Sequence, residues 1–161
     1  MLDRGLPIKI RVVNLHVSFG DHQVLQGVDL EVRQGETMVV IGGSGTGKTV
    51  LIKCVIGLVH PDEGRIHVDG TEITSLKERE MNDVRKKFGM LFQGGALFDS
   101  LTVWENVGFG LRQHTQLDED EIRRIATEKL ALLGLRNIED LMPAELSGGM
   151  KKRVSLARAI A

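Results

Sequence analysis

Apolar and polar residues alternate near the N-terminus, and this spacing of two predicts β-strands. One run covers residues 13–19 and places Val13, Leu15, Val17 and Phe19 on one apolar face. A second run covers residues 25–32. Residues 65–70 end in Asp69-Gly70, a sequence typical of a tight hairpin turn. We therefore expect the first part of the chain to be rich in β-structure.

Residues 37–41 are apolar on both faces, which is typical of a strand buried inside a parallel sheet. This run ends in a glycine cluster at Gly42. From Lys48 to about Leu58 the apolar spacing becomes helical, and residues 60–64 carry the proline and glycine of a turn. Residues 88–92 predict another brief strand, which leads to Gln93.

The pattern then becomes mainly helical. Residues 102–112 predict one helix, and Asp118 with Glu121 forms a capping box at the start of another. Apolar residues recur at helical spacing until Gly134 supplies a C-terminal stop; they are Ile122, Ile125, Ala126, Leu130 and Leu133. A last helical stretch follows Ser147 and runs to the end of the sequence at Ala161.

Composition excludes several classes of protein. With 42% hydrophobic and 27% charged residues the chain reads as globular rather than disordered. A net charge of -1 gives no general attraction to nucleic acid. No apolar run approaches the roughly 20 residues that span a bilayer, so a membrane role is expected to come through a partner. Cys54, the one cysteine, cannot form an internal disulfide, and the default expectation is a cytosolic protein.

The strongest chemical motif lies between the predicted buried strand and the helix after it. Residues 42–49 fit the pattern G-x-x-x-x-G-K-[ST] and are named here the phosphate loop; they are Gly42, Gly43, Ser44, Gly45, Thr46, Gly47, Lys48 and Thr49. Glycines allow successive backbone N–H groups to point at one anion, and the helix that begins near Lys48 adds its positive end. Lys48 is expected on the β and γ phosphates and the Thr49 hydroxyl on Mg²⁺. The alternative is a glycine-rich turn with an incidental lysine.

A second motif, Leu146-Ser147-Gly148-Gly149-Met150, stands directly before a helix. Ser147 is a favourable N-cap, and the two glycines leave N–H groups free to meet an anion. Alone, this segment is better explained as a capped helix without a ligand. Its position about 100 residues after a phosphate loop favours a nucleotide-related role.

Together these motifs give the chain a resemblance to the nucleotide-binding subunits of ATP-binding cassette (ABC) transporters. The order matches over the whole chain: Phe19, the phosphate loop, Gln93 after a predicted strand, and the segment 146–150. Residues 90–98, 111–117 and 141–150 resemble in particular the ATPases of the phospholipid transporters that maintain lipid asymmetry in Gram-negative bacteria. Met150 departs from the glutamine common in the superfamily, and we interpret it as a marker of this subgroup.

The resemblance implies an α/β fold of the P-loop NTPase class, with a RecA-like core, an N-terminal antiparallel β subdomain and a helical insert. Residues 1–94 and 143–161 would form the core and β subdomain, and residues 95–142 the helical subdomain. It also implies a homodimer in which ATP lies between one phosphate loop and the partner's Ser147, Gly148 and Gly149. Permease subunits would attach this ATPase to the cytoplasmic face of the inner membrane.

Several residues keep two interpretations. Phe19 either stacks on adenine, as the resemblance implies, or continues the apolar core face. Gln93 takes its role at Mg²⁺ or the attacking water only from the resemblance. Residues 96–98 and Trp104 form either a groove for a membrane subunit or local core. Residues 151–153 are expected to be a solvated helix face rather than a lipid patch, and Cys54 is expected to be a small buried apolar residue.

The resemblance also implies that ATP hydrolysis uses an Asp-Glu pair at the end of an apolar strand and a later histidine. Neither occurs within the 161 residues: every histidine precedes Ser147, and the acids of 118–121 cap a helix. We therefore expect the sequence to be a truncated record of a longer ATPase, with residues 38–41 as an apolar, association-prone edge. Three alternatives stay open: a cassette ATPase for another substrate, a nucleotide-binding module without hydrolysis, and a kinase or GTPase, which would leave residues 146–150 unexplained.

Overall fold

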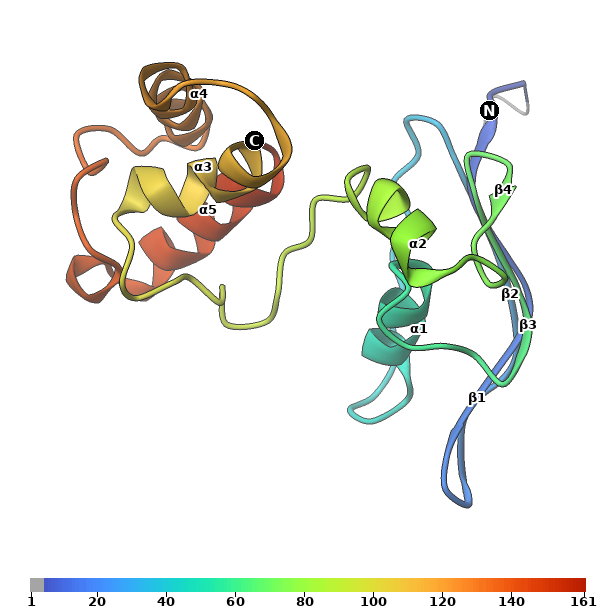
Figure 1. Cartoon of the computed structure of the whole chain (residues 1–161). Helices are drawn as coiled ribbons and strands as arrows, with labels where there is room; N and C mark the ends of the chain where they lie inside the picture. Colours follow the sequence, from blue (N-terminus) through green and yellow to red (C-terminus); the bar gives the residue numbers. More distant parts are fainter. Residues whose placement is uncertain (1–4) are drawn as a thin grey trace. The chain divides into compact units, whose positions relative to one another are not determined.

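The computed structural model describes residues 5–161, and the chain forms two compact units (Figure 1). The first unit is Met1–Lys87 and the second is Phe88–Ala161. The first contains all the strands, whereas the second is helical. Among the described residues, no helix combines the length and the apolarity needed to cross a membrane.

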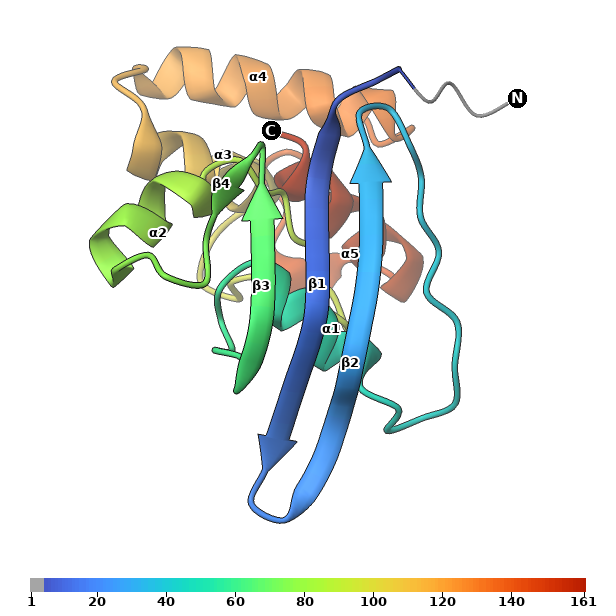
Figure 2. The same ribbon diagram turned by 90° about the vertical axis from the view of Figure 1, so that its right-hand side faces the viewer.

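The first unit is built on a four-stranded antiparallel sheet with the strand order β2-β1-β3-β4 (Figure 2). The strands are β1 (Ile8–Phe19), β2 (His22–Arg33), β3 (Glu63–Val68) and β4 (Thr71–Glu72). Asp69 and Gly70 turn the chain from β3 to β4 with positive φ angles of 50° and 79°. Positive φ at both turn residues is the requirement of a type I′ hairpin. The antiparallel β region expected from the sequence is therefore confirmed.

A bulge in β1 changes which of its residues face the core. The register with β2 and β3 shifts between Val12 and Leu15, where Asn14 has a φ of 47°. Val12 is 2% exposed and Leu15 is fully buried, but Val13 is 36% exposed. The prediction that Val13 shares the apolar face of Leu15 and Val17 is wrong, because the extra residue reverses the alternation at this point.

Two helices accompany the sheet. The first, α1 (Lys48–Val55), lies against one side of it in both Figure 1 and Figure 2, and it buries Leu51 and Cys54. The second, α2 (Glu78–Arg85), was not predicted from the sequence. Among its eight residues only Met81 and Val84 are buried. Two apolar residues among charged ones give too weak a periodic pattern to indicate a helix.

The two strands predicted at 37–41 and 88–92 do not form. Neither segment has strand structure, and Val39 and Ile41 are 72% and 89% exposed. A strand exists only where a neighbour takes up its backbone N–H and C=O groups. In residues 5–161 no strand pairs with either segment, so the apolar composition alone does not produce a sheet.

The second unit packs its helices around one apolar core. It contains α3 (Val103–His114), α4 (Glu119–Leu132), the short 3₁₀ turn η1 (Pro143–Glu145) and α5 (Gly148–Ala159). The helices α3 and α4 confirm the two helices predicted from residues 102–112 and 118–134, whereas the subdomain bounds 95–142 stay a prediction. Their buried residues form a cluster with residues of α5 and of the connecting loops: Val103, Val107, Ala126, Leu130, Leu135, Ile138, Leu146, Val154 and Ala157. In this structure α5 thus packs with α3 and α4. The assignment of 143–161 to the core subdomain stays a prediction.

Side-chain caps begin both of the predicted capped helices. Asp118 accepts a hydrogen bond from the Glu121 backbone N–H at 2.8 Å, and Gly134 follows α4 with a φ of 70°. The Glu121 carboxylate pairs with Arg124, so only half of the predicted capping box is made. Ser147 accepts from the Met150 N–H at 3.3 Å and begins α5.

Candidate functional site

The phosphate loop approaches the start of β2 so closely that only glycine fits at position 47. Gly45 and Gly47 have φ angles of 79° and 90°, a region that favours glycine. A Cβ atom at Gly47 would lie 2.8 Å from Leu25 and 2.9 Å from Val24. The helix α1 begins at the next residue, Lys48, with no side-chain cap at its N-terminus. The loop therefore presents uncapped helical N–H groups, as the motif predicts.

The Lys48 ammonium lies over the loop and donates to its carbonyl oxygens. Its Nζ is 2.8 Å from the Gly42 oxygen, 2.5 Å from the Gly43 oxygen and 3.3 Å from the Thr46 hydroxyl. Thr46 in turn donates to the Gly43 oxygen at 3.0 Å. Among the described residues, the backbone N–H groups of Gly45, Thr46 and Gly47 donate to no other main-chain atom. These donors and the ammonium are the groups that an anionic ligand requires.

A hollow of about 260 Å³ lies beside the loop and reaches the tip of the β1–β2 hairpin. It is lined by Phe19, His22 and Val24 and by residues 45–50 of the loop and α1. Phe19 is 55% exposed, so its ring is not part of the core. The structure thus brings Phe19 together with Lys48 and Thr49. Gly42, Gly43 and Ser44 belong to the same loop but do not line the hollow.

His22 and Val24 are lining residues that sequence reasoning did not single out. The signal was present, because Phe19 and His22 are separated only by the Gly20-Asp21 turn and pair directly across the hairpin. Val24 stands directly before the apolar run predicted at residues 25–32. Neither belongs to a motif with fixed spacing, so only the fold shows that they share a hollow with the phosphate loop.

The remaining predicted residues lie in the second unit. Gln93 is exposed and occupies a turn in which the Gly95 N–H donates to the Phe92 oxygen at 3.0 Å. Residues of α5 hold the backbone just after it. Ser155 donates to the Gly95 oxygen at 2.9 Å, and Arg158 donates to the oxygens of Gly95 and Ala96 at 3.0 and 2.8 Å. Whether Gln93 approaches the phosphate loop stays a prediction.

The segment 147–149 is exposed at the N-terminus of α5, a helix of 12 residues. Nothing lies within 4 Å of the positions that Cβ atoms on Gly148 and Gly149 would occupy. The first turn contains no acidic residue. A helix start that is open to solvent and carries no acidic side chain suits an anion. Its role toward a nucleotide stays a prediction.

The residues with two interpretations divide between core and surface. Leu97, Trp104 and Met150 pack against the core of the second unit, whereas Phe98 is 42% exposed and its ring centroid lies 4.6 Å from that of Phe109. Lys152 and Arg153 are exposed, as expected of a solvated helix face.

Cys54 is 2% exposed, and burial, with a smaller effect of Asp62, raises the pKa of its thiol to about 11. It is the small buried residue that the sequence predicts.

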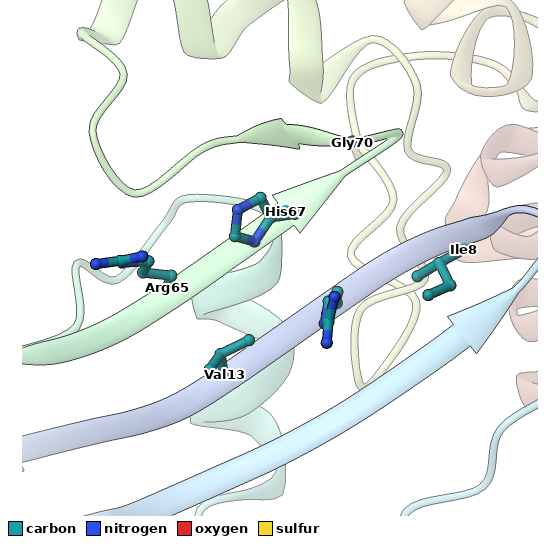
Figure 3. A pocket seen from close by; sticks show the side chains of 6 residues that line it. Ile8, Val13, Arg65, His67 and Gly70 are labelled. Carbon is teal, nitrogen blue, oxygen red and sulfur yellow. The ribbon is translucent and has the colours of Figure 1, made fainter.

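A second hollow, of about 440 Å³, lies on the outer face of the sheet (Figure 3). Val13, Arg65 and His67 project into it from β1 and β3, and Ile8, Arg11 and Gly70 complete its lining. The Arg11 Nε lies 3.1 Å from Glu31, and the His67 Nε2 lies 3.7 Å from Glu72. Acidic neighbours thus offset part of the basic charge. The lining contains no glycine loop or helix start that could surround an anion.

The donors of the first hollow suit a polyphosphate. The loop supplies N–H groups and an ammonium at one end, and Thr49, which is exposed, lines the same hollow. Within residues 5–161, no group of three or more His, Cys, Asp or Glu could hold a metal alone.

The chain is similar in sequence to known ATP-binding proteins of transport systems. The sequence is 47% identical to the probable ribonucleotide transport ATP-binding protein mkl of Mycobacterium tuberculosis over 158 residues, 97% of this chain and 44% of mkl. It is also 47% identical to the intermembrane phospholipid transport system ATP-binding protein MlaF of Haemophilus influenzae, over 94% of this chain and 58% of MlaF. The chain thus spans about half the length of the curated relatives it matches.

Solved structures share the fold. The ATP-binding cassette MJ0796, in a dimeric state bound to ADP and phosphate, superposes with a TM-score of 0.87 and 30% identity over 94% of this chain and 69% of MJ0796. This likeness confirms the expected α/β fold of the P-loop NTPase class. The sequence profile of the ABC transporter family matches residues 25–161, which include the phosphate loop and the segment 146–150. The chain belongs to the ABC transporter family.

Proposed function

We propose that the chain is the ATP-binding part of an ABC transporter ATPase. The observation that carries this proposal is the shared hollow in which the exposed ring of Phe19, Lys48 and Thr49 lie around one glycine loop at the start of α1. A ring at one end and phosphate donors at the other suit a nucleoside triphosphate. A simple glycine-rich turn does not explain why an exposed ring, an ammonium and a hydroxyl line one hollow.

Each residue has a separate role in this proposal. The N–H groups of residues 45–49 and the Lys48 ammonium bind the β and γ phosphates, and the Thr49 hydroxyl is a ligand of Mg²⁺. The metal, when bound, neutralises phosphate charge and polarises the terminal phosphoryl group. Gln93 is proposed as a further contact of Mg²⁺ or the attacking water. Phe19 supports the base.

The second unit supplies the contact to another copy of the chain. In this proposal Ser147, Gly148 and Gly149 bind the γ-phosphate held by the partner's phosphate loop, so ATP becomes part of a homodimer interface. The open helix start at Gly148 supports this role. Closure of the dimer on ATP and its opening after hydrolysis would move attached permease subunits at the cytoplasmic face of the inner membrane.

Phospholipid is the proposed cargo of the whole transporter, on the strength of the match to MlaF. The equal identity to mkl, whose name refers to ribonucleotide transport, keeps a cassette ATPase for another substrate as the second candidate. The phosphate loop serves both alike, because the cargo is handled by other subunits.

The proposal is tested by replacing the ammonium over the loop. Lys48→Ala removes the one cationic side chain that lines the hollow, so we expect ATP affinity to fall by about tenfold or more. Binding of a fluorescent ATP analogue, measured by anisotropy with and without Mg²⁺, checks this. Lys53→Ala, on the same helix but outside the lining, is the matched control. Equal affinity of wild type and Lys48→Ala would remove the proposal.

A further inference from the structure

The tip of the β1–β2 hairpin places a second ring beside Phe19. The two residues are direct partners in the antiparallel ladder, and such partners point to the same face of the sheet with Cβ atoms about 5 Å apart. Gly20, the first of the two turn residues, has a φ of 60°, and Asp21 does not have a positive φ. This is the pattern of a type II′ hairpin, a turn that holds its flanking pair in fixed register. The geometry therefore fixes His22 next to Phe19.

The imidazole of His22 is not used by the rest of the fold. It is exposed, and among residues 5–161 it makes no hydrogen bond or ion pair. The other histidines of the first unit differ, since His16, His60 and His67 each lie near a polar partner. His22 instead lines the hollow that contains Lys48 and Thr49. A ring held in place by the backbone, with no internal partner, is available to a ligand.

The order of residues along the hollow indicates which part of a ligand this ring meets. Lys48 and Thr49 lie at the start of α1, and Val24 touches the loop at Gly47, so the phosphate donors occupy that end. Phe19 and His22 occupy the hairpin end. A nucleotide bound with its phosphates on the loop directs its base toward the two rings.

We propose that His22 is a second base-contacting residue, whose imidazole extends the aromatic surface of Phe19 and stacks on the base of a purine nucleoside triphosphate. This inference rests on the proposed function, because it takes the phosphates to lie on the loop. Aromatic rings stack on bases through their π faces, and a purine presents a larger face than a single phenyl ring covers. Two rings side by side therefore favour base-bearing ligands over bare polyphosphate.

The test compares a ligand with a base and a ligand without one. Binding of ATP and of inorganic tripolyphosphate to the full chain is measured by isothermal titration calorimetry. For His22→Ala we expect ATP affinity to fall by about fivefold to tenfold, while tripolyphosphate affinity stays unchanged. His22→Phe keeps a ring at the position and is expected to retain ATP affinity within about twofold.

Gln23→Ala is the matched control. Gln23 is the next residue of β2, is also exposed, and does not line the hollow, so its loss is expected to leave both ligands unaffected. ATP affinity unchanged in His22→Ala, or an equal loss for ATP and tripolyphosphate, would overturn the inference. Lys48→Ala separates the two proposals, because it is expected to weaken both ligands. If Lys48→Ala affects neither, it is the proposed function that fails.

Discussion

Single residues decide the shape of the sheet beside the candidate site. Gly64 has a φ of 95°, and a Cβ atom there would lie 2.4 Å from the Asn14 backbone oxygen. It faces the bulge that turns Val13 outward and keeps Leu15 in the core. The bulge and its glycine could not be predicted from the alternation of residues 13–19, because the same pattern fits an unbroken strand.

We expect Gly64→Ala to destabilise the first unit by about 3 kcal/mol, since the new methyl group meets backbone atoms and the φ angle is strained. The midpoint of urea unfolding, followed by circular dichroism, measures this. Gly20→Ala is the control: its φ is 60°, but nothing lies within 4 Å of its Cβ position, so a cost of about 1 kcal/mol is expected. Equal costs for the two variants would contradict the steric argument.

Among the elements, helices were predicted better than strands, and the reason is physical. The starts of α4 and α5 follow from Asp118 and Ser147, because a cap satisfies nearby N–H groups with a local side chain. The segments 37–41 and 88–92 have suitable composition, but a strand depends on a partner that its own sequence does not contain. The phosphate loop could be predicted because its residues are contiguous in the sequence. The place of His22 beside it could not, because it depends on how the hairpin folds onto the loop.

The start of α3 makes the stability of the second unit depend on pH. Glu105 accepts from both the hydroxyl and the backbone N–H of Thr102, and these hydrogen bonds lower the pKa of its carboxyl group. A lowered pKa in the folded state stabilises the fold above the unfolded pKa of about 4.3, and the effect is lost as pH falls through the folded pKa. We expect Glu105→Gln to lose stability less steeply between about pH 5 and pH 3.

Urea unfolding of the second unit at a series of pH values checks this expectation. Asp120→Asn is the control, because Asp120 is exposed and makes no hydrogen bond or ion pair within residues 5–161. Parallel pH profiles for wild type and Glu105→Gln would show that the cap does not contribute.

At the scale of the whole molecule, residues 38–41 form a run of four consecutive exposed apolar residues. Ile41 and Val39 are far more exposed than the core residues of either unit. An apolar backbone segment with unpaired N–H and C=O groups readily pairs with another copy. The sequence predicts an apolar strand edge at this place, whereas the structure has an exposed irregular segment. Its tendency to associate stays a prediction.

We expect the chain to self-associate as its concentration rises, and the double variant Val39→Ser/Ile41→Ser to do so less. Sedimentation velocity over a range of concentrations measures the change. Leu132→Ser provides a comparison, because Leu132 is 73% exposed but belongs to a helix, α4, rather than to an irregular apolar segment. If both variants reduce association equally, general surface hydrophobicity is the cause.

The buried Cys54 has a practical consequence for studying this chain. With its thiol shielded inside the first unit and its pKa at about 11, little reactive thiolate forms near neutral pH. A cysteine introduced on the surface, for example by Gln23→Cys at the hairpin, would react with maleimide dyes or spin labels long before the native one. The response of the hairpin to added nucleotide can thus be followed spectroscopically without first removing the natural cysteine.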